Sequence, residues 1–81
     1  MEYTYRPSGV CARNIRFSIE NGFIKNVEFT GGCNGNAQGL SRLVEDMPAD
    51  EAIRRLEGIR CGNKSTSCPD QLALAIRKAL A

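Results

Sequence analysis

Apolar and polar residues alternate along the first half of the chain. Residues 15–20 place Ile15, Phe17 and Ile19 on one side and polar side chains on the other. This two-residue period is typical of a β-strand with one buried face. Residues 3–5 are rich in tyrosine and threonine, which favours a short first strand before a turn.

The pair Asn21-Gly22 follows the second predicted strand. It indicates a tight hairpin, because a type I′ turn needs positive φ at both central positions. A return strand is predicted over residues 23–30, with Val27 and Phe29 on one face. Ile24 breaks that alternation, which favours either a β-bulge near the turn or burial of both faces of the strand.

The second half of the chain has the spacing of helices. Helices are predicted over residues 36–46, over residues 49–57 with Gly58 as the stop, and from TSCPD at residue 66 to the end. Their predicted inner stripes are Leu40, Leu43, Val44 and Met47; Ile53 and Leu56; and Leu72, Ile76, Ala79 and Leu80. The order of elements predicts an α+β domain, a three-stranded antiparallel sheet followed by three helices.

Length and charge narrow the class of protein. A chain of 81 residues is expected to form one domain over residues 1–81. The formal net charge of +2 gives no nucleic-acid footprint. Neither a membrane-spanning run nor a signal peptide is evident, so we expect a cytoplasmic protein. There, cysteines are more often metal ligands or redox groups than structural disulfides.

The four cysteines are the candidate functional residues. All stand in predicted connections or at a helix start, not on the apolar face of an element, where a cysteine that only packs would lie. Thiols in connections are better placed to converge on a metal ion. The candidate metal ligands are Cys11, Cys33, Cys61 and Cys68.

The residues around Cys68 suit a thiolate at a helix start. The positive end of the helix dipole would stabilise negative charge on the sulfur. Pro69 is expected at the first helical position, and Ser67 with Asp70 has the spacing of a capping box. Three cations lie close in sequence to cysteines and are expected to offset thiolate charge: Arg13, Arg60 and Lys64.

The cysteine spacing leaves several chemistries open. No CxxC pair is present, so the chain does not match a CxxC-type zinc finger. Four thiolates suit tetrahedral Zn²⁺ or, alternatively, an iron–sulfur cluster. Disulfides and free redox thiols remain alternatives. A Cys₄ zinc site has no open coordination position and would supply the staple that so small a core needs.

The chain resembles the TSCPD domain family over nearly its whole length. The resemblance rests on the hairpin, on GGCNGNAQGL at residues 31–40, on the pair Arg60-Cys61, and on TSCPDQLALAI at residues 66–76. Members resemble a C-terminal segment of adenosylcobalamin-dependent ribonucleotide reductases and also occur as small four-cysteine proteins. The resemblance implies that the cysteines bind metal and that the chain is related to ribonucleoside-diphosphate reductase.

A more distant resemblance links the chain to the U-type iron–sulfur scaffold proteins. It rests on IKNVEFTGGC at residues 24–33, followed by small residues and a helix. It implies the scaffold fold, with Cys11, Cys33 and Cys68 at metal-ligand positions and Cys61 near the place of a scaffold histidine. The present sequence contains no histidine.

Three functions remain open on this basis. The first, which we favour, is a Cys₄ metal-binding module that acts through a protein partner. The second is an accessory domain of ribonucleotide reduction. The third is a metal-free thiol redox protein that uses Cys68. For the expected protein partner, a ribonucleotide reductase and a component of cluster assembly both stay open. We expect no catalytic activity of the isolated chain, because it offers no histidine as a base.

Overall fold

The computed structural model describes residues 2–9, 12–31, 34–60, 62 and 65–81. The sheet has strand order β1-β2-β3, all antiparallel. Its strands and the helices that follow are β1 (Glu2–Tyr5), β2 (Ala12–Glu20), β3 (Phe23–Gly31), α1 (Asn34–Val44), α2 (Ala49–Leu56) and α3 (Cys68–Leu80). The predicted α+β class and element order are confirmed.

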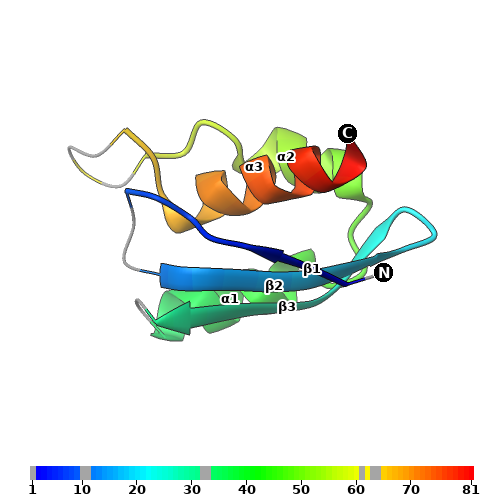
Figure 1. Cartoon of the computed structure of the whole chain (residues 1–81), viewed down its shortest axis with the longest axis horizontal. Helices are drawn as coiled ribbons and strands as arrows, with labels where there is room; N and C mark the ends of the chain where they lie inside the picture. Colours follow the sequence, from blue (N-terminus) through cyan, green and yellow to red (C-terminus); the bar gives the residue numbers. More distant parts are fainter. Residues whose placement is uncertain (1, 10–11, 32–33, 61, 63–64) are drawn as a thin grey trace.

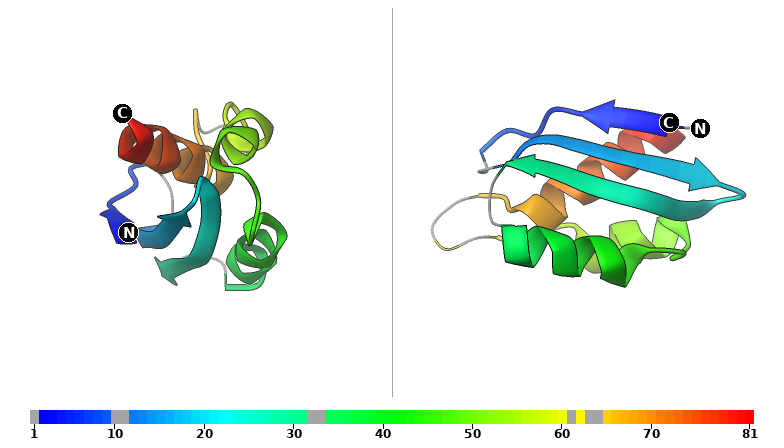
Figure 2. Two further views of the ribbon diagram at one scale, coloured as in Figure 1. Left: turned by 90° about the vertical axis from the view of Figure 1, so that its right-hand side faces the viewer. Right: turned by 90° about the horizontal axis from the view of Figure 1, so that it is seen from below.

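All three helices lie on the same side of the sheet (Figure 1, Figure 2). Helix α1 packs along β3, and α2 packs against α3, which crosses the face of β2. Both chain ends and the β2–β3 hairpin lie at one end of the molecule. The starts of α1 and α3 lie toward the other end.

The register gives the sheet one apolar face and one polar face. Tyr3 lies opposite Phe17, with their ring centroids 5.6 Å apart, and Ile15 lies opposite Phe29. These side chains belong to the face that the helices cover. The buried core they join also takes in the fully buried Ile24, Leu72, Ile76 and Val44.

The opposite face of the sheet carries charge. Arg16 on the central strand reaches Glu2 on β1 at 3.7 Å (Nε to Oε2) and Glu28 on β3 at 3.0 Å (Nη2 to Oε1). All three side chains are more than half exposed. Such exposed pairs contribute about 0–1 kcal/mol each, so this ladder favours the register more than it stabilises the fold.

The predicted turn and bulge are both present. Asn21 and Gly22 have φ of 55° and 84°, the positive pair that a type I′ turn requires. Farther along β3, Asn26 has φ of 55°, and the register shifts so that two residues of β3 oppose one of β2. The extra residue lets both Ile24 and Val27 point into the core, which explains the broken alternation.

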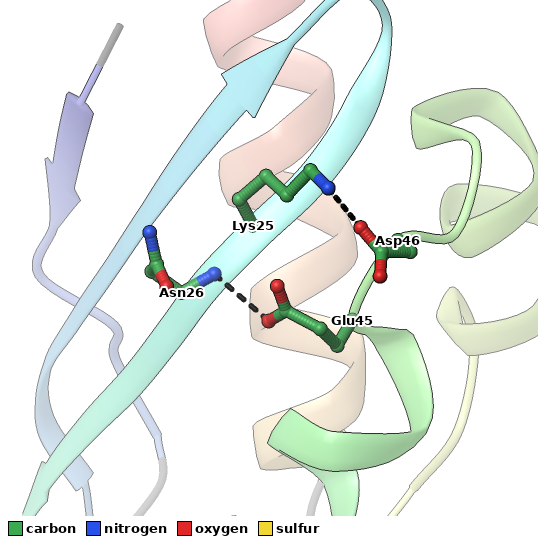
Figure 3. A network of polar contacts seen from close by, with 4 residues as sticks. All are labelled: Lys25, Asn26, Glu45 and Asp46. Atoms are coloured by element: carbon green, nitrogen blue, oxygen red, sulfur yellow. Dashed lines mark hydrogen bonds and ion pairs between the residues drawn. The ribbon is translucent and has the colours of Figure 1, made fainter.

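The outer edge of β3 is closed by the segment after α1 (Figure 3). The backbone of Ile24 accepts a hydrogen bond from the N–H of Asp46 at 2.8 Å and donates one to the carbonyl of Met47 at 2.9 Å. Lys25 forms an ion pair with Asp46, and the N–H of Asn26 donates to Glu45 Oε1 at 2.9 Å. This part of the sheet edge is therefore not available for pairing with another chain.

Two predicted core positions and one boundary are corrected. Leu43 is 76% exposed and Leu80 is half exposed, whereas Val44 is 2% exposed. Helix α1 begins and ends two residues earlier than predicted, and beyond its end Asp46 adopts φ of 66° and pairs with the edge of β3. No helix among the described residues is long and apolar enough to cross a bilayer.

The bulge makes Asn26 a sensitive position. A left-handed residue other than glycine or asparagine costs about 1–2 kcal/mol. Asn26→Ala should therefore lower the free energy of unfolding by about that amount in urea titration. Asn26→Gly is the matched control and should change it far less, since both variants keep the backbone N–H that bonds to Glu45. Equal losses for the two variants would contradict a role for the positive φ.

Candidate metal centre

Of the four candidate ligands, the structure describes Cys68 alone. Its thiol is free and half-buried, and it is the first residue of α3. Cys11, Cys33 and Cys61 lie outside the described residues. The structure therefore shows the surroundings of Cys68 and the described residues that neighbour the other three cysteines in the sequence.

Ser67 begins α3 as its N-cap. Its backbone is extended (φ −152°, ψ 171°), and its Oγ accepts a hydrogen bond from the N–H of Asp70 at 3.2 Å. The same hydroxyl donates to the carbonyl of Ile59 at 2.7 Å. This bond is one half of the predicted capping box. In place of the other half, the Asp70 carboxylate bonds to Thr66 and Gly58. Pro69 is the second helical residue and not the first as predicted, a position whose N–H also needs no intrahelical acceptor.

The carboxylate of Asp70 binds the connection between α2 and α3. It accepts a hydrogen bond from the hydroxyl of Thr66 at 2.5 Å and one from the N–H of Gly58 at 2.7 Å. The Thr66 hydroxyl first, and then the Gly58 N–H, lower the pKa of Asp70 below its ordinary value of 3.8. Asp70 therefore binds the backbone N–H of Gly58, which precedes Cys61 by three residues.

Gln71 makes the corresponding link to the β1–β2 connection. Its side chain is 4% exposed; Nε2 donates to Thr66 Oγ1 at 2.9 Å, and Oε1 accepts from the N–H of Ser8 at 3.1 Å. Gln71 was not among the residues predicted for the site. Its signal was a polar residue four positions before Ala75, on the inner face of α3. Thr66, Ser67, Asp70 and Gln71 are called the helix-start cluster below.

Close packing reinforces the link between these two segments. Gly9 has φ of 74°, and a Cβ built there would lie 3.1 Å from Cγ2 of Thr66. A larger residue would meet both backbone strain and a crowded neighbour. The described residue two positions before Cys11 is therefore held against the residue two positions before Cys68.

The strand register places the end of β3, which precedes Cys33 in the sequence, beside the start of β2, which follows Cys11. Ala12, which follows Cys11, pairs with Gly31, which precedes Cys33 by two residues. In Figure 1 the start of β2, the end of β3, and the starts of α1 and α3 all lie toward the end opposite the hairpin. This end is called the cysteine end below. The described neighbours of all four cysteines therefore gather there.

Cationic side chains accompany these neighbours. Arg6, Arg13 and Arg60 are exposed, and Arg60 lies near enough to Asp70 to act on its carboxylate. No group of three or more metal-ligand side chains occurs within the described part of the chain. The sequence offers four thiols, and this donor set fits a tetrahedral thiolate site.

The described residues form a small α+β domain, a three-stranded sheet covered by three helices, and its sequence contains four cysteines. The TSCPD domain model matches residues 2–80. The chain therefore belongs to the TSCPD domain family. No curated protein and no solved structure matches the chain.

The lowered pKa of Asp70 makes the helix-start cluster sensitive to acid. Its charge contributes stability above pH 3.8 that is lost as pH falls through the lower folded-state pKa. We expect the difference in unfolding free energy between the parent and Asp70→Asn to be constant near neutral pH and to shrink below pH 3.8. Urea unfolding of reduced, metal-free protein across this range measures it.

Ser65→Ala, an exposed change five residues before Asp70 that removes no carboxylate, is the control for this measurement. Its difference in unfolding free energy from the parent should stay constant across the same pH range. A difference for Asp70→Asn that stays constant through the acid range would contradict a stabilising role for its charge.

Proposed function

We propose that the chain is a metal-binding module that holds one metal centre through Cys11, Cys33, Cys61 and Cys68. The observation that carries the proposal is the gathering of their described neighbours at the cysteine end. The Ala12–Gly31 pair joins the start of β2 to the end of β3. The hydrogen bonds of Gln71 and Asp70 join the start of α3 to the β1–β2 and α2–α3 connections. Thiols that only packed in a core would not require the β1–β2, β3–α1 and α2–α3 connections to meet the start of α3.

Zn²⁺ is the ion we favour, with an iron–sulfur cluster as the alternative. Soft thiolates select both, and a closed Cys₄ zinc site is structural. The protein carries a formal charge of +2 with its thiols neutral. Four thiolates and one Zn²⁺ would bring that sum to zero, so zinc leaves no large uncompensated charge.

The metal would stabilise the fold by linking distant segments of the chain. The buried core consists of a few large side chains and several alanines, which is a modest apolar area for a stable fold. A ligand that binds only the folded state at 100 times its Kd adds about 2.7 kcal/mol. A zinc site would therefore supply a substantial part of the stability of so small a domain.

A protein partner is the second part of the proposal. We propose no catalysis by the isolated chain and a cytoplasmic setting, in which thiols stay reduced. The resemblance to a reductase segment nominates a ribonucleotide reductase, and the resemblance to scaffold proteins nominates a component of cluster assembly. The exposed arginines of the cysteine end favour a partner with an acidic surface.

Elemental analysis of protein purified without chelator, with an anaerobic preparation alongside, tests the metal. We expect about one zinc per chain, as one tetrahedral Cys₄ site requires. Cys68→Ser should remove the metal and lower the melting temperature, since one ligand is lost. Ser65→Ala, an exposed change three residues earlier, is the control and should keep both.

The other outcomes point elsewhere. If elemental analysis finds iron with an equal amount of sulfide, the proposed centre is an iron–sulfur cluster and not zinc. Four titratable thiols in a metal-free protein would contradict it and favour thiol redox chemistry at Cys68.

A further inference from the structure

Gln71 is an unusual residue to find inside so small a core. It is 4% exposed and adjoins Leu72, which is fully buried. A glutamine is mostly exposed in folded proteins, because its amide must find partners when it leaves water. Here both ends of the amide are satisfied, by Thr66 at 2.9 Å and by Ser8 at 3.1 Å.

The two partners of Gln71 lie close in sequence to two proposed ligands. Ser8 precedes Cys11 by three residues, and Thr66 precedes Cys68 by two. The Ser8 bond spans 63 residues of chain. A single side chain therefore connects the β1–β2 connection to the start of α3, at the point where each leads to a thiol.

We propose that Gln71 is a positioning residue for the cysteine end, one that holds the segment before Cys11 against the helix start that carries Cys68. This inference rests on the proposed function, since it assigns Gln71 to the same centre. Gln71 does not touch the metal in this arrangement. It acts on thiol placement through Thr66 and through the backbone of Ser8.

A purely structural role is the competing explanation. A buried side chain of this shape fills space whether or not it bonds. Methionine has nearly the same length, is a good helix former, and cannot make either hydrogen bond. Gln71→Met therefore separates filling from positioning.

The first readout is the affinity for Zn²⁺, measured by competition with a chromophoric chelator. Loss of a hydrogen-bonding partner that orients metal ligands typically costs 10–100-fold in metal affinity. We expect a loss of about that size for Gln71→Met. The matched control is Gln38→Met, the same change at an exposed site on α1 five residues after Cys33, and it should leave the affinity unchanged.

The second readout needs no metal. A bifunctional thiol reagent such as dibromobimane joins cysteines that lie side by side, and mass spectrometry identifies the pair. In reduced, metal-free protein the Cys11–Cys68 product should form in the parent and fall severalfold in Gln71→Met. Circular dichroism confirms that each variant keeps its fold.

These readouts separate the two proposals. Zinc binding with unchanged affinity and crosslinking in Gln71→Met would overturn the positioning role and leave the Cys₄ centre intact. No zinc in the parent, with crosslinking reduced in Gln71→Met, would overturn the metal centre and support positioning of the thiols. No zinc and unchanged crosslinking would overturn both.

A second pair of variants applies if Gln71→Met does not fold. Thr66→Val removes the hydroxyl that accepts from Gln71, whereas Thr66→Ser retains a hydroxyl. Thr66→Val should reduce the Cys11–Cys68 product and Thr66→Ser should restore it. Equal products from the two would overturn the proposal.

Discussion

The helix-start cluster is the constraint on which the cysteine end depends. A helix leaves its first four N–H groups without intrahelical acceptors, and proteins commonly satisfy them with one N-cap side chain. Here the same turn also binds outward. Asp70 and Ser67 hold the α2–α3 connection, and Gln71 holds the β1–β2 connection. The start of α3 therefore joins segments that are far apart along the chain.

The magnitudes assign different tasks to the two ends of the molecule. Burying a side chain such as Phe17 or Ile24 contributes about 1.5–3 kcal/mol, whereas an ordinary hydrogen bond contributes about 0.5–1.5 kcal/mol net. Stability therefore comes chiefly from the core between sheet and helices. The helix-start cluster adds less free energy but fixes the positions of the connections more closely. A buried polar group that loses its hydrogen-bond partner costs about 1–3 kcal/mol. That penalty disfavours other arrangements of the connections.

Much of the fold could be predicted from the sequence because local patterns determine it. Alternation along β2 gave its buried face, and Asn21-Gly22 gave the hairpin, since each signal lies within a few residues. The exposure of Leu43 could not be predicted the same way. Leu43 and Val44 are neighbours on α1, and which of them faces the core depends on how the helix docks on β3, a contact that periodicity does not encode.

The candidate site likewise contains features that local sequence predicts and features that depend on contacts between distant segments. The Ser67 cap could be predicted from residue types, and so could the family. The role of Gln71 could not, because its partners are Thr66 and a backbone group 63 residues away. A polar residue on an otherwise apolar helix face was the available signal. Such a residue indicates that a partner exists without saying which segment provides it.

The proposed ligands lie far apart along the chain, and this has an energetic consequence that a compact zinc knuckle lacks. A metal that joins Cys11 to Cys68 closes a loop of most of the chain, whereas a CxxC pair closes almost none. Each doubling of the closed loop restricts the unfolded chain by a further ~0.6 kcal/mol. Ligands spread along the chain therefore gain more stabilisation from one ion, provided that the folded protein brings them together at little cost. The helix-start cluster and the Ala12–Gly31 pairing bring together the described segments beside the cysteines, so the proposed centre would gain this stabilisation without a large cost of ordering those segments.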